Sequence, residues 1–202
     1  MRSVCVYCGA NPGARPSYAE AAAALGTEIA RRGLRLVYGG GSVGLMGAVA
    51  SAAAAGGGAV LGVIPDELQP AEVSGAAVGE VRVVKDMHER KALMNESAEA
   101  FVALPGGFGT LEELMEMVTW QQLGFHSKPV GVLNVDGYYD VFLQFLDHCM
   151  REGFVSARNR AIVVVGTTPG ELLDRLEAYE PGESLVSMAK RGALPAVSVA
   201  AG

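Results

Sequence analysis

The sequence lacks any apolar run long enough to cross a membrane. A membrane-spanning helix needs about 18 to 20 consecutive apolar residues, and no stretch of this chain approaches that length. Its first residues, Met1-Arg-Ser3, lead into a short strand-like run instead of a signal peptide with a cleavage site. We therefore expect a cytoplasmic protein with no membrane partner.

Cysteine is also scarce. The three cysteines cannot all pair, and a cytoplasmic compartment keeps thiols reduced. Cys5 and Cys8 spell a C-x-x-C motif, but the loop-like residues 9–13 follow it where a redox motif would open a helix. No second cysteine pair offers a zinc site. We expect buried thiols, no metal and no cofactor.

Basic residues are outnumbered, with 16 Lys and Arg against 22 Asp and Glu and a net charge of −6. Nucleic-acid partners usually require a basic face, so this balance argues against them. None of the lysines follows a glycine, which excludes a Walker A phosphate loop.

What the chain does contain is a regular alternation of apolar strands and helices. At 202 residues, half of them hydrophobic, it is long enough for one α/β domain with a sizeable core. The pattern predicts a doubly wound, Rossmann-like parallel sheet over residues 1–180, followed by a flexible tail at 181–202. The expected strands cover residues 4–7, 34–38, 59–64, 80–84, 100–104, 129–133 and 162–165. Ligands of such sheets bind beyond the carboxyl ends of the strands.

Two helix starts carry capping signals. Ser17 with Glu20 three residues later fits a capping box. Thr168-Pro-Gly-Glu171 places a threonine cap before proline at the first helical position and glutamate at the third.

The most informative stretch is Pro105–Glu113, which reads Pro-Gly-Gly-Phe-Gly-Thr-Leu-Glu-Glu. It lies between a strand-like run and apolar residues at helical spacing, so it is expected to connect a strand to a helix. Glycines at such a turn let backbone N–H groups approach an anion, and the helix N-terminus adds positive partial charge. Thr110 and Glu113 also fit a capping box, which any helix start could use. Three glycines in four positions favour a phosphate site.

This stretch resembles the Pro-Gly-Gly-x-Gly-Thr-x-x-Glu motif of the Lonely Guy family, the cytokinin-activating phosphoribohydrolases. Residues 87–94, Met-His-Glu-Arg-Lys-Ala-Leu-Met, match that family's Met-His-x-Arg-Lys-x-x-Met motif. The resemblance covers about residues 3–166 and implies hydrolysis of N6-substituted adenosine 5′-monophosphates to free base and ribose 5-phosphate. The family has also carried a lysine decarboxylase label, but nothing in this sequence suggests a pyridoxal phosphate lysine.

The resemblance implies that Arg90 and Glu113 are catalytic. Arg90 lies on the same side of its helix as Met87 and Met94, where a cation must either extend outward or meet an anion. A carboxylate such as Glu113 suits the ribosyl cation that glycosidic cleavage produces. The substrate-binding residues implied are Glu72, Met87, Arg90, Lys91, Gly106, Gly107, Phe108, Gly109, Thr110, Leu111, Glu112 and Thr119.

A second glycine-rich turn comprises Gly39, Gly40, Gly41 and Gly44, and it satisfies G-x-G-x-x-G. Asp66 lies near the place where a dinucleotide site has its acidic ribose partner. The match falls in the second strand–helix unit, however, so mononucleotide binding or tight packing is favoured over NAD.

We expect a homodimer from the family resemblance, with a nucleotide as the small-molecule substrate. Two alternatives stay open at the level of sequence: a general AMP nucleosidase, and a regulatory module that binds a nucleotide without turnover. Trp120 and the tyrosines are expected to pack against other side chains instead of forming a base-stacking platform.

Overall fold

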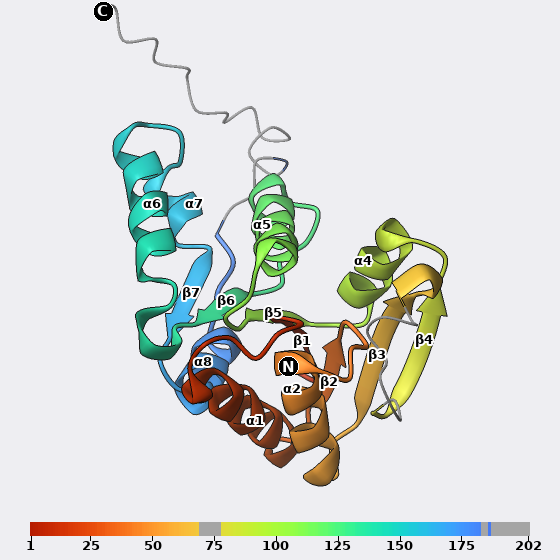
Figure 1. The fold of residues 1–202 in the computed structure, drawn as a ribbon. Helices are drawn as coiled ribbons and strands as arrows, with labels where there is room; N and C mark the ends of the chain where they lie inside the picture. Colours follow the sequence, from red (N-terminus) through yellow and green to blue (C-terminus); the bar gives the residue numbers. More distant parts are fainter. Residues whose placement is uncertain (69–77, 183–185, 187–202) are drawn as a thin grey trace, which may run out of the picture.

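The computed structural model describes residues 1–68, 78–182 and 186. Its strands form one parallel sheet in the order β4-β3-β2-β1-β5-β6-β7 (Figure 1). The strands are β1 (Ser3–Tyr7), β2 (Arg35–Tyr38), β3 (Val60–Pro65), β4 (Glu80–Val84), β5 (Ala100–Ala103), β6 (Val130–Leu133) and β7 (Val163–Gly166). The predicted doubly wound α/β fold is confirmed.

Helices cover both faces of the sheet. The helices are α1 (Pro16–Arg31), α2 (Gly44–Ala55), α4 (Met87–Glu96), α5 (Phe108–Leu123), α6 (Asp140–Arg151), α7 (Ala157–Arg160) and α8 (Pro169–Glu177), with short 3-10 turns η1 (Asp66–Leu68) and η2 (Val135–Gly137). Helices α1, α2 and α8 pack on one face, and α4, α5 and α6 pack on the other (Figure 1).

The central strand β1 shows how the sequence sets these layers. All five of its residues are buried, as expected for a parallel strand covered on both faces. Val4 and Val6 join the core beneath α1 and α2, whereas Cys5 and Tyr7 join the core beneath α5. This alternation follows from the two-residue period of a strand.

The order of the strands reverses at β1. The chain adds β2, β3 and β4 on one side of β1, then crosses to add β5, β6 and β7 on the other. At such a switch point the loops that leave neighbouring strands diverge, and a crevice opens at the carboxyl ends. The crevice of this protein therefore lies beyond β1 and β5.

One predicted helix cap is confirmed and another is wrong. Thr168 caps α8, since its Oγ1 accepts a 3.3 Å hydrogen bond from the N–H of Glu171. Helix α1 instead begins at Pro16, which places Ser17 inside the first turn. The Ser17 hydroxyl donates to Asp136 at 2.6 Å and caps no helix.

Some predictions concern residues that the structure does not describe. Glu72 and most of the tail predicted for 181–202 lie outside the described residues. Within the described part of the chain, no helix has the length and apolar character needed to cross a membrane.

Candidate active site

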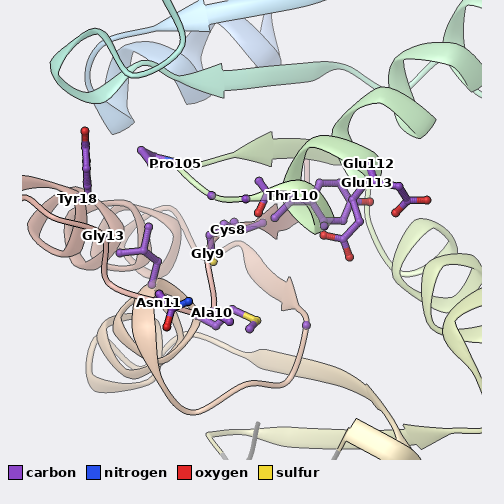
Figure 2. A pocket seen from close by; sticks show the side chains of 18 of the residues that line it. Cys8, Gly9, Ala10, Asn11, Gly13, Tyr18, Pro105, Thr110, Glu112 and Glu113 are labelled. Carbon is purple, nitrogen blue, oxygen red and sulfur yellow. The ribbon is translucent and has the colours of Figure 1, made fainter. Parts of the chain in front are cut away.

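A cavity of about 430 Å³ opens at the switch point of the sheet. Its walls come from the three turns that follow β1, β2 and β5, together with α4 and the start of α5. Figure 2 shows the loop that carries Asn11 on one side of it and Thr110 and Glu113 on the other.

The turn after β5 presents the N-terminus of α5 to this cavity. The helix begins at Phe108, and its N-cap is Gly107, which has no side chain to cap the first turn. The first N–H groups of a helix lack intrahelical acceptors, which makes such an end a natural anion site. The capping box predicted for Thr110 and Glu113 is wrong, because both residues lie within the helix.

Gly106 is the tightest point of that turn. A Cβ on Gly106 would come within 2.1 Å of the Thr110 Oγ1 and 2.9 Å of the Gly9 nitrogen. Gly107 and Gly109, in contrast, have open space where a Cβ would lie. Gly106 therefore serves the packing of the turn, whereas Gly107 and Gly109 leave room beside the helix start for a ligand.

Glu113 lies one helical turn beyond Gly109 and lines the same cavity. Only 8% of its surface is exposed. A carboxylate this well buried is costly unless it serves an interaction or a reaction.

Arg90 reaches the cavity from α4 and is 7% exposed. Its Nη2 donates to the carbonyl oxygen of Gly39 at 3.1 Å, and its Nη1 lies 3.6 Å from the Met87 sulfur. Its Nε is buried without a hydrogen-bond partner among the described residues. The guanidinium therefore keeps one unsatisfied donor inside the protein.

The negative charge of Glu113 affects the pKa of two nearby thiols, those of Cys5 and Cys8. Burial raises the pKa of Cys5 and of Cys8 far above the usual thiol range, and the Glu113 carboxylate raises both further. Both cysteines are buried and unpaired, as predicted. The C-x-x-C motif therefore holds protonated thiols, with no nucleophile and no disulfide.

The structure brings most of the predicted site residues together. Met87, Arg90, Gly106, Gly107, Gly109, Thr110, Glu112 and Glu113 line the cavity. Four others do not line it within this one chain: Lys91, Phe108, Leu111 and Thr119. Phe108 is 95% exposed, and Thr119 donates to the carbonyl of Met115 on its own helix.

Of the second glycine-rich turn, Gly39 alone among its four predicted glycines lines the cavity. Asp66 begins η1 on the surface and does not line it within the described part of the chain. Among the described residues, Asp66 therefore gives no support to a dinucleotide site on this turn.

Sequence reasoning missed several residues that line the cavity. They are the loop after β1 (residues 8–13), Tyr18, Leu45, Met46, Met94 and Tyr138. The loop could have been found, since it follows a strand whose carboxyl end faces the crevice. Tyr18 and Tyr138 were expected only as packing residues, and they line the cavity, where their ring centroids lie 5.7 Å apart in an edge-to-face arrangement.

Comparison with known proteins places this chain in a family. A cytokinin riboside 5′-monophosphate phosphoribohydrolase of Arabidopsis thaliana is 56% identical over 181 residues, which span 90% of this chain and 83% of that protein. An enzyme of the same name from Oryza sativa subsp. japonica is 57% identical over 181 residues, 90% of this chain and 75% of that protein. A family model described as possible lysine decarboxylase matches residues 46–176. The chain belongs to the Lonely Guy family.

Solved structures with lower identity share the fold. A molybdenum cofactor binding protein from Rippkaea orientalis has a TM-score of 0.66 at 22% identity, covering 88% of this chain and 96% of that one. A molybdenum cofactor carrier protein from Chlamydomonas reinhardtii has the same TM-score and coverages at 23% identity. These matches show that the Rossmann-like architecture is shared.

The described lysines give the decarboxylase description of the family model no support. Lys91 donates to Glu112 at 2.6 Å and to Glu116 at 3.0 Å. Burial acts to lower the pKa of Lys91, but these two carboxylates outweigh it and raise that pKa. A Schiff-base lysine requires the reverse. Burial does lower the pKa of Lys128, but its Nζ is held by Asn95. No described lysine lines the cavity.

Proposed function

We propose that the protein hydrolyses the N-glycosidic bond of adenosine 5′-monophosphates that carry an N6 substituent, releasing the free base and ribose 5-phosphate. The observation that carries this proposal is the joint placement of buried Arg90 and Glu113 in one cavity with the uncapped start of α5. The relatives named above have this activity in their names.

In the proposed reaction the bond between C1′ and N9 breaks, and its electron pair leaves with the base. The ribose then carries positive charge, as in glycoside hydrolysis. Glu113 stabilises that charge and accepts a proton from the water that attacks C1′. The departing base takes up a proton at N9, which holds the electron pair of the broken bond. Arg90, which lines the same cavity, holds the sugar hydroxyls or the carboxylate of Glu113 in position.

The start of α5 would bind the 5′-phosphate, which anchors the substrate at a distance from the breaking bond. Adenosine lacks this group, so its kcat/KM should be lower than that of AMP by orders of magnitude. Comparable values for the two compounds would contradict a phosphate site at Gly107 and Gly109.

Met46, Met87 and Met94 give the cavity an adaptable apolar wall. Such a wall suits an alkyl substituent on the base. Release of base from N6-isopentenyl-AMP and from AMP, measured side by side, tests this preference. Equal kcat/KM would identify a general AMP nucleosidase, and binding without release would identify a regulatory module.

We also infer that the protein acts as a homodimer in the cytoplasm. Phe108 is 95% exposed beside the cavity, and Val141 and Phe145 on α6 are 77% and 59% exposed. A second copy would remove such apolar surface from water, and two-fold dimers are the commonest oligomers. The unpaired thiols suit a reducing compartment. A fully active monomer in sedimentation at assay concentration would contradict the dimer.

A further inference from the structure

The second glycine-rich turn faces the cavity only through Gly39 and has no role in the reaction described above. We propose that Gly39 is a positioning residue for Arg90: its carbonyl oxygen holds the guanidinium, and its missing side chain makes room for it. The inference rests on the proposed function, because it takes Arg90 to be catalytic.

The contacts of Arg90 carry the first part of this inference. The guanidinium belongs to α4, yet its Nη2 donates at 3.1 Å to Gly39, which follows β2. The interaction is buried and joins residues 51 positions apart. Because Arg90 is a long side chain with several rotamers, a fixed acceptor at its tip selects the one that enters the cavity.

The space around Gly39 carries the second part. A Cβ on Gly39 would lie 2.1 Å from the Arg90 Nη2 and 3.3 Å from its Cζ, with the Met46 sulfur at 3.0 Å. The φ angle of Gly39 is not in the left-handed region, so backbone conformation does not require glycine there. What requires glycine at this position is the guanidinium lying against its Cα.

Two other glycines shape the rest of this turn. Gly40 has a φ of +80°, and Gly44 has a φ of +60°. A Cβ on Gly44 would lie 2.1 Å from the carbonyl oxygen of Ala10, and the next N–H, that of Leu45, donates to Gly9 at 3.1 Å. The loop after β1 thus covers the start of α2. The start of α2 therefore contacts the loop after β1. This contact favours a positioning role for the turn over a phosphate site.

A double-mutant cycle tests the inference. We expect Gly39→Ala to lower kcat for N6-isopentenyl-AMP about a hundredfold, the loss typical of a small displacement of a catalytic group. In an Arg90→Ala background the same change should lower kcat by less than about twofold, because the group it displaces is already gone. Equal losses in both backgrounds, or near-normal kcat for Gly39→Ala, would overturn the inference.

Gly58→Ala is the matched control, since its Cβ would lie 2.9 Å from Ala30, away from the cavity. It should lower the melting temperature and leave kcat unchanged. If Gly39→Ala does not fold, the double variant decides: folding restored by Arg90→Ala supports the contact, and failure of both to fold overturns it.

A crystal structure of Gly39→Ala separates this inference from the proposed function. A guanidinium displaced from residue 39 supports positioning, and an unmoved one overturns it, whatever the activity. A wild-type protein that releases base from neither nucleotide would refute the proposed function alone.

Discussion

The backbone N–H of Gly9 donates a 3.0 Å hydrogen bond to the carbonyl oxygen of Pro105. These residues follow β1 and β5, the two strands between which the order of the sheet reverses. Just before these two residues, the N–H of Leu104 donates to the carbonyl oxygen of Tyr7 at 2.9 Å. The hydrogen-bond ladder between β1 and β5 therefore continues directly into the cavity. The floor of the candidate site is therefore an extension of the sheet and shares its rigidity.

Gly109→Ala should separate ligand binding from stability. Residue 109 lies in the first turn of α5, and a Cβ there meets nothing within 4 Å. Alanine in a helix is more stable than glycine by about 0.5 to 1 kcal/mol. We expect thermal unfolding to shift upward while KM for AMP rises, because the methyl group occupies the space offered to phosphate. An unchanged KM would contradict the phosphate site.

Gly106→Ala provides the contrast. Its Cβ would meet the Thr110 hydroxyl at 2.1 Å, so this variant should lose stability as well as activity.

The sequence was enough to predict the strands, the doubly wound class of the fold and the glycine-rich turn before α5, because each is signalled by local patterns. The apolar runs specify buried parallel strands, and Pro105–Glu113 specifies a turn before a helix. The capping box at Thr110 failed because the same residue types occur inside helices, and a pattern three residues long does not fix where the helix begins. Tyr138 could not be predicted in the site, since its position depends on how α6 packs over the sheet.

Tyr138→Phe should weaken substrate binding without unfolding the protein. The Tyr138 hydroxyl donates to the carbonyl oxygen of Gly106 and so fixes the turn from the α6 side. A hydrogen bond of this kind is worth about 0.5 to 1.5 kcal/mol, which corresponds to a loss in kcat/KM of about two- to tenfold. Tyr179→Phe removes a hydroxyl that bonds Gln121 instead, away from the cavity, and should leave kcat/KM unchanged. Equal kcat/KM for Tyr138→Phe and wild type would show that the Tyr138 hydroxyl has no part in substrate binding.

His126 should make the protein less stable in mild acid. Burial lowers the pKa of His126 to about 4, and the nearby Lys128 contributes. The ordinary histidine pKa of the unfolded chain is about 6.5. Between these values the unfolded chain binds a proton that the folded protein does not, so stability falls as the pH decreases from about 6.5 to 4.

The measurement compares melting temperatures at pH 7.5 and pH 5 for wild type and His126→Gln. The variant should show a smaller decrease than wild type. His148→Gln alters an exposed histidine on α6 and serves as the control. The same decrease in wild type and His126→Gln would show that other groups govern the acid response.

The sharpest test concerns Glu113, for which the structure has removed the simplest structural explanation. Glu113 is not a capping residue, since α5 begins five residues before it, at Phe108. Its charge is nevertheless held in a cavity at 8% exposure. Glu113→Gln keeps the shape of the side chain and removes the charge that the ribosyl cation needs. Loss of general-base action alone costs about 10² to 10⁴ in rate. The variant should therefore fold, bind AMP and lose at least about a hundredfold in kcat.

Glu116→Gln, one turn further along α5 and outside the cavity lining, is the matched control and should keep its kcat. Near-normal turnover by Glu113→Gln would leave the proposed reaction without its carboxylate and would refute the catalytic role of Glu113.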